Sequence, residues 1–456
     1  MPFSRPYRLL SAALGVILLS ASGPSARADW ISDWNELALD AGRNSNELSP
    51  EISRSMAMLS TAMYNSLEGI SGNYNLYTQG SYSGPSGNAA PGASFQAATS
   101  AAAYTVLSGL YQSMEPAFFT LYQNQLTSLG GDPGLISGIN FGTLVGNDIL
   151  NWRATDGAAV ASDPNLYSSV GSAGHWSEAS TDTALLPGWG SVSTFAIAST
   201  TGFSGTLGMS NTAYIATSAY ATDYNTVKDI GSASSGTRTL PQTQAALFWH
   251  GAQGTTSNVG IWNSIAEGIV TSQGLSLDET ARLYAALNVA MADAAIVALD
   301  TKYSVDFWTP EQAIQNGGAD SNALTIADPA WAALLGTEEM PSYFAQQGIF
   351  AGSAVPILEL FAGTNYAFTI EFDTDGDGIN DMTRTFSSLA DALAEATYSS
   401  VWGGLSFEKD ALDAASAGNQ IANTVMNSQF APVPEPAGAL LLGIAGILSI
   451  ARRRRR

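Results

Sequence analysis

Leu277–Asp300 reads LDETARLYAALNVAMADAAIVALD, and this stretch decides the fold class. Ser276 and Glu279 have the spacing of a capping box, which begins a helix. Apolar residues then recur at helical spacing along one face: Leu283, Leu287, Met291, Ala294 and Val297. The other faces are also apolar, with Ala285, Ala286, Ala290 and Ile296. The sequence therefore predicts a helix over 277–300 that is buried on nearly all sides.

A second helix is predicted to begin at Ser49–Pro50, a serine N-cap followed by proline and Glu51. Apolar residues follow in steps of three and four: Ile52, Met56, Leu59, Met63, Leu67 and Ile70. We expect further helices over 95–126, 354–362, 387–398 and 409–427. Their number indicates a mainly α protein, without an internal repeat.

Other segments predict loops and one small sheet. Residues 68–95 are rich in Gly, Ser, Asn and Pro and indicate a long surface loop. Residues 155–240 carry few charges, and we expect loops with short helices there. Tyr366–Phe372 and Arg384–Phe386 predict one short β-hairpin.

Both ends of the chain resemble targeting segments. Arg5 and Arg8 precede the apolar stretch Leu9–Ala21, and Ala26-Arg27-Ala28 has the pattern of a cleavage site. We therefore expect residues 1–28 to be a signal peptide. The mature domain is then expected over 29–430, followed by a tail over 431–456.

The tail contains Val433-Pro434-Glu435-Pro436, the apolar run Ala437–Ala451 and five arginines, Arg452–Arg456. An apolar run before arginines is a stop-transfer pattern, but this run is shorter than the roughly 20 residues of a spanning helix. The tail resembles the PEP-CTERM sorting signal of Gram-negative bacteria. The resemblance implies export through the inner membrane, cleavage by sorting machinery there, and release to the outer surface or extracellular matrix. The alternative is a plain C-terminal membrane anchor.

Composition excludes several classes of function. The two ends carry eight of the 17 basic residues and one of the 39 acidic ones, so the net charge of −22 becomes −29 in the mature chain. Such a surface repels nucleic acid and anionic membranes. The chain has no cysteine, which excludes disulfides and thiolate metal sites. Its two histidines, His175 and His250, exclude multi-histidine metal sites.

The segment Asp373-Thr374-Asp375-Gly376-Asp377-Gly378-Ile379-Asn380-Asp381 predicts a calcium site at the tip of the hairpin. Its acids, Asp373, Asp375, Asp377 and Asp381, occupy positions 1, 3, 5 and 9 of the loop. Position 12 of an EF-hand would be a glutamate but is Arg384 here, so the pattern is closer to the Asp-rich repeats of thrombospondin type 3 and dockerin modules. The alternative is a solvated acidic turn without an ion.

Two parts of the chain resemble the vanadium-dependent haloperoxidases, which are related to type 2 phosphatidic acid phosphatases. The first part contains Trp34-Asn35-Glu36 and Ser55–Asn65 (SMAMLSTAMYN). The second begins at Arg238–Trp249 (RTLPQTQAALFW) and continues through Ala292-Asp293-Ala294, Lys302-Tyr303, Phe307–Ile314 (FWTPEQAI), Met340–Tyr343 (MPSY), Gly363–Tyr366 (GTNY), Thr383–Phe386 (TRTF) and Trp402–Phe407 (WGGLSF). The resemblance covers nearly the whole mature chain. It implies two four-helix bundles around one pocket that binds vanadate or phosphate.

The resemblance also implies a pocket that has lost most of its anion-binding groups. Lys302 matches the family's lysine. Its two arginines correspond to Thr309 and Ser400, and its two histidines to Gln347 and Ser406. These changes argue against vanadate binding, because a buried oxyanion needs arginine forks and several positive charges. The alternative for Lys302 is a structural pair with Asp293 or Asp306.

These observations predict an exported, non-catalytic protein that binds the extracellular matrix or an exopolysaccharide, with calcium as an accessory ion. The other possibility is an active haloperoxidase-related or acid-phosphatase-type enzyme with a reshaped pocket. No base partner is visible in the sequence for any serine, and His250 is distant in sequence from the motif segments.

Overall fold

The computed structural model describes residues 29–178, 183–336 and 339–432. The predicted signal peptide and the Pro-Glu-Pro, apolar and arginine parts of the tail lie outside these residues. The described chain is mainly helical, with 14 α-helices and one two-stranded antiparallel sheet. The fold class predicted from the sequence is confirmed.

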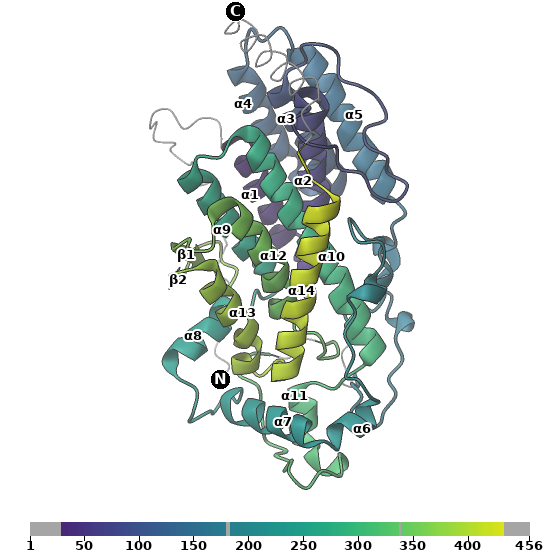
Figure 1. The fold of residues 1–456 in the computed structure, drawn as a ribbon, viewed down its shortest axis with the longest axis vertical. Helices are drawn as coiled ribbons and strands as arrows, with labels where there is room; N and C mark the ends of the chain where they lie inside the picture. The colour runs from purple at the N-terminus through teal and green to yellow at the C-terminus, as the bar shows by residue number, and fades with distance from the viewer. Residues whose placement is uncertain (1–28, 179–182, 337–338, 433–456) are drawn as a thin grey trace, which may run out of the picture.

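The helices form two bundles (Figure 1). The N-terminal bundle contains α1 (Asp29–Asn44), α2 (Ser49–Ser71), α3 (Phe95–Leu110), α4 (Glu115–Ser128) and α5 (Leu135–Arg153). The C-terminal bundle contains α9 (Ser257–Gln273), α10 (Leu277–Val305), α12 (Gln346–Ala362), α13 (Leu389–Gly403) and α14 (Glu408–Ser428). Short helices lie outside the bundles: α6 (Asn211–Ile215), α7 (Ser218–Ile230), α8 (Leu240–Phe248) and α11 (Pro310–Gln315).

The helix α10 joins the two bundles, because it packs against α2 on one side and against α12 and α14 on another. Its capping box is present, with Ser276 and Glu279 as predicted. Among the helices of the described chain, α10 alone is long and apolar enough to cross a membrane, judged by length and composition. Its apolar window is 94% buried inside the protein, as expected for the central helix of a core.

The helix predicted over 95–126 is wrong in one respect, because the chain breaks it into α3 and α4. A 3₁₀ turn, Gln112–Met114, separates the two helices. Pro116 lies in the first turn of α4, where its missing N–H costs nothing, whereas inside one continuous helix it would remove a hydrogen bond. The helix predicted over 354–362 begins earlier, at Gln346, and contains Pro356.

The hairpin is present, with β1 (Phe368–Phe372) paired to β2 (Met382–Phe386). Phe368 lies opposite Phe386, and Phe372 opposite Met382. Residues 373–381 form the loop at its tip, as predicted. The hairpin packs against α9 and α13 at one side of the molecule (Figure 1).

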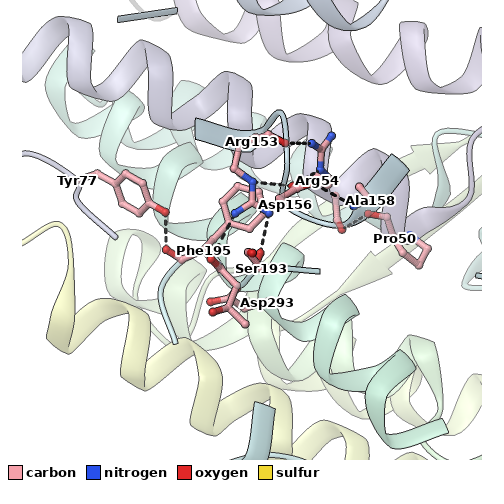
Figure 2. Close-up of polar contacts among 11 residues, drawn as sticks. Pro50, Arg54, Tyr77, Arg153, Asp156, Ala158, Ser193, Phe195 and Asp293 are labelled. Carbon is pink, nitrogen blue, oxygen red and sulfur yellow. Dashed lines mark hydrogen bonds and ion pairs between the residues drawn. The ribbon is translucent and has the colours of Figure 1, made fainter. Parts of the chain in front are cut away.

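The region 155–240 contains loops, short 3₁₀ helices and the helices α6 and α7, as predicted. A buried polar cluster holds part of it against the bundles (Figure 2). The guanidinium of Arg153, at the end of α5, donates to Asp156 Oδ2 at 2.8 Å and to the carbonyl of Ser193 at 2.6 Å. Arg153 is 1% exposed, and its guanidinium carbon lies 3.9 Å from the centre of the Phe195 ring. Arg54 of α2 donates to the same Asp156 oxygen at 2.7 Å.

The same region is bound from its other side by Asp293, in the middle of α10. Its carboxylate accepts hydrogen bonds from three successive backbone N–H groups, those of Phe195, Ala196 and Ile197, at 2.5, 2.8 and 2.9 Å. Burial raises the pKa of Asp293 to about 6, although these bonds act in the opposite direction. Side chains from α5 and α10 thus bond directly to the backbone of residues 193–197, whereas Arg54 of α2 binds Asp156, whose carbonyl accepts from the N–H of Ser193.

Candidate functional site

Four of the five residues predicted from the family resemblance line one small cavity, called here the lysine cavity. They are Lys302, Thr309, Gln347 and Ser406. The other lining residues are Met340, Pro341, Ser342, Gln346 and Leu405. The cavity has a volume of about 30 Å³, which is room for roughly two water molecules.

The lysine cavity lies where α10, α11, α12 and the start of α14 converge. Lys302 is in the last turn of α10, Thr309 caps the N-terminus of α11, and Gln347 is in the first turn of α12. Ser406 lies between α13 and α14 and is buried. Residues far apart in the sequence therefore meet at one cavity.

Lys302 is 6% exposed, and backbone carbonyls of the protein accept its hydrogen bonds. Its ammonium donates to the carbonyl of Pro341 at 2.7 Å and to that of Ser342 at 3.0 Å. The carboxylates that the sequence offered as partners bind elsewhere. Asp293 accepts the three backbone N–H groups described above, and Asp306 accepts from the Tyr167 hydroxyl at 2.7 Å and lies 2.8 Å from His175 Nδ1.

The uncharged residues of the set form mostly local hydrogen bonds. The Thr309 hydroxyl accepts from the N–H of Gln312 at 3.3 Å, as an N-cap. Gln347 Nε2 donates to the carbonyl of His250 at 3.5 Å, so the backbone of His250 lies next to the site, contrary to its distance in the sequence. Ser400 is not among the residues that line the cavity, and its hydroxyl donates to the carbonyl of Thr397 within α13.

The structure adds a pair of residues that the sequence did not predict, Ser342 and Asp410. Ser342 lines the lysine cavity, and its hydroxyl donates to Asp410 Oδ2. Asp410 is 1% exposed, and burial raises its pKa to about 7, while the hydrogen bond from Ser342 and the charge of Lys302 lower it. The expectation that no serine has a base partner is therefore wrong for Ser342. The one available signal was the place of Asp410 at the third position of α14, where a carboxylate turns back toward the helix start.

The predicted calcium loop brings three of its four acids together. Carboxylate oxygens of Asp373, Asp375 and Asp377 lie within 4.8 Å of one another. Gly376 and Gly378 adopt φ angles of 80° and 88°, which explains the glycines between the acids. Asp381 is not in this group, because its carboxylate accepts from the N–H and the hydroxyl of Thr374 at 2.8–2.9 Å.

Comparison with known proteins agrees with this architecture. Residues 282–433 match the family described as the VCPO second helical-bundle domain. A bacterial vanadium-dependent iodoperoxidase of known structure is 20% identical, with a TM-score of 0.73, and the alignment covers 91% of this chain and 100% of that one. Apo and holo structures of a bacterial vanadium-dependent chloroperoxidase are 13% and 14% identical, each with a TM-score of 0.64 and coverage of 83% of this chain and 92% of that one. No curated protein matches by sequence. The chain therefore has a vanadium-haloperoxidase-like fold.

The residues present do not fit vanadate. A vanadate group of two or three negative charges needs several cationic donors and a side chain able to ligate vanadium. Lys302 is the one cation among the residues that line the cavity, and its ammonium already donates to two carbonyls. Ser406, which the family resemblance aligns with the ligating histidine, offers only a hydroxyl group in place of an imidazole.

Proposed function

We propose that this protein is a non-catalytic binding or structural protein built on a haloperoxidase-like fold. The observation that carries the proposal is the position of Lys302, whose ammonium donates to the carbonyls of Pro341 and Ser342. In this arrangement the protein's own backbone supplies the acceptors that an oxyanion would otherwise provide. Binding of a buried anion would have to break these hydrogen bonds. It would also cost about 3–5 kcal/mol of free energy for each missing charged partner.

The proposed location is the outer cell surface or the extracellular matrix. The signal peptide pattern of residues 1–28 and the resemblance of the tail to a PEP-CTERM signal support export and processing at the inner membrane. The matrix or an exopolysaccharide is the proposed partner, because the mature net charge of −29 disfavours nucleic acid and anionic lipid. In this proposal the tail is a transient membrane anchor.

The purified mature chain should show no calorimetric binding of orthovanadate or phosphate, because the lysine cavity lacks the cations that such anions need. The matched variant is Lys302→Ala, which removes the one lining cation. Micromolar binding that disappears in Lys302→Ala would contradict the proposal. In assays of iodide and bromide oxidation with added vanadate, the unmodified mature chain and Lys302→Ala should likewise give the same oxidation rate.

The second candidate function is an enzyme with a reshaped pocket, and the Ser342–Asp410 pair is the observation that favours it. A serine hydroxyl that donates to a carboxylate of pKa about 7 has the arrangement of a nucleophile beside a general base. The small volume of the lysine cavity opposes this function. Turnover of an activated ester or phosphate monoester that is lost in Ser342→Ala would establish the enzyme.

Calcium is proposed as an accessory ion at Asp373, Asp375 and Asp377. At 10 mM calcium, a site with a dissociation constant of about 0.1–1 mM would stabilise the folded state by about 1.4–2.7 kcal/mol. We expect chelation to lower the thermal midpoint and to increase protease cleavage near Asp377. Asp375→Asn should remove the response, whereas Asp381→Asn should keep it because Asp381 binds Thr374. An unchanged midpoint on chelation would leave the solvated acidic turn as the correct interpretation.

A further inference from the structure

The largest of the cavities described for this chain is a groove between α1, α9 and the hairpin, called here the acidic groove. Its volume is about 570 Å³, within the range of small-molecule sites. Its lining includes Asn35, Glu36, Asp40, Glu267, Phe368 and Glu371. It shares no lining residue with the lysine cavity. Ligand binding in the acidic groove would therefore not depend on whether the lysine cavity binds an anion.

The groove is rich in hydrogen-bond acceptors and negative charge. Five carboxylates line it, against one cation, Arg43. Arg43 is already paired with Asp40 at 2.9 Å and lies 3.6 Å from Asp373. Glu36, Glu267 and Glu371 are exposed and come from three different elements, α1, α9 and β1. A ligand that enters the groove therefore meets carboxylates on several sides.

A buried amide in the wall of the groove lacks a partner. Asn35 is 4% exposed, and its side-chain oxygen has no hydrogen-bond partner. An unpaired buried acceptor is unfavourable, and a hydrogen bond from a ligand or a water molecule would remove this cost. The Asn35 oxygen thus requires the same kind of group as the carboxylates, an N–H or O–H donor.

Aromatic rings give the groove an apolar face. Tyr366 and Phe368 are half-buried and stacked, with ring centres 5.7 Å apart and planes 15° apart. The hydroxyl groups of Tyr366 and Ser272 lie 3.2 Å apart, which restrains the Tyr366 ring. Such faces pack against methylene or sugar C–H groups and attract ammonium groups.

We propose that the acidic groove binds a ligand with two or more primary ammonium groups on an aliphatic or sugar backbone. Ammonium groups would pair with the carboxylates of Glu36 and Glu371 and donate to Asn35, while the backbone lies on Tyr366 and Phe368. This inference goes beyond the proposed function, because it names a ligand chemistry that does not depend on the lysine cavity.

The test is calorimetric titration of the mature chain with three probes in the presence of a chelator. Spermidine represents an aliphatic polyamine, the glucosamine trimer an amino sugar, and the N-acetylated trimer a neutral sugar of the same shape. We expect spermidine or the glucosamine trimer to bind with an affinity that falls as salt rises, and the tighter of the two identifies the backbone. Binding of neither amine, or equal binding of the N-acetylated trimer, would overturn the proposal.

Variants locate the binding in the groove. Glu371→Gln is isosteric and exposed on β1, so it should keep the fold and weaken binding by about two- to fivefold. The matched control is Asp229→Asn, an exposed acid of α7 outside the groove, which should leave the affinity unchanged. Equal weakening by both variants would indicate general attraction to an acidic surface and would overturn the proposal. Asn35→Leu should weaken binding while the far-ultraviolet circular dichroism spectrum stays unchanged.

Discussion

Replacing Arg153 with methionine should lower the free energy of unfolding by about 3–5 kcal/mol. The arginine is buried, and its guanidinium bonds to Asp156 and to the Ser193 carbonyl while it stacks on Phe195. Methionine fills a similar volume but leaves the Ser193 carbonyl without its donor and Asp156 with one cation fewer. Urea denaturation followed by circular dichroism measures the change.

Arg54→Met is the matched control for this prediction. Arg54 binds the same oxygen of Asp156, but its side chain is 17% exposed, and Asp156 would keep Arg153 as a partner. We expect a loss of about 1 kcal/mol, as for a hydrogen bond at a partly exposed site. If Arg153→Met were no more destabilising than Arg54→Met, the buried cluster would not carry the stability assigned to it.

Replacing Gly142 with alanine should destabilise the N-terminal bundle by about 1–3 kcal/mol, the usual cost of an overpacked contact. A Cβ at this position would lie 2.0 Å from the backbone oxygen of Ala98 on α3. Backbone cannot rotate away as a flexible side chain can, so α3 and α5 must separate. The loss should appear as a lower urea midpoint without loss of helical signal.

The control for Gly142 is another helical glycine with open surroundings. A Cβ on Gly268 of α9 would meet one atom, the Tyr366 hydroxyl oxygen, at 3.4 Å. Gly268→Ala should therefore be neutral or stabilising by up to about 1 kcal/mol, because alanine has the higher helix propensity. A neutral Gly142→Ala would mean that α3 and α5 are not held in such close backbone contact.

The sequence predicted α2 and α10, whose apolar periodicity is strong, although the N-cap of α2 is Leu48 and not the predicted Ser49. It missed α1, α5 and α9. In α5 the glycines at 138, 142 and 146 suggest helix breakers, yet they are where the backbone of α3 comes close. A close contact between two helices is a property of the pair, so neither sequence segment shows it alone.

The site was predictable to the extent that a family resemblance could place its residues. One cavity is lined by four of these residues, Lys302, Thr309, Gln347 and Ser406. The hydroxyl of the fifth, Ser400, donates to a backbone carbonyl of its own helix, α13. The Ser342–Asp410 pair joins residues 68 positions apart, and no local pattern links them. The acidic groove likewise forms only when α1, α9 and the hairpin come together.

The apolar character of α10 also bears on how an exported chain would cross the inner membrane. On the proposed route of export, the unfolded chain would pass through a translocon, which releases sufficiently apolar helices sideways into lipid. The window of α10 resembles such a helix by length and composition. Asp293 interrupts it near its middle, and an aspartate there opposes insertion by about 2.5–3.5 kcal/mol. The carboxylate that holds residues 195–197 in the folded protein would thus also favour complete passage of the unfolded chain.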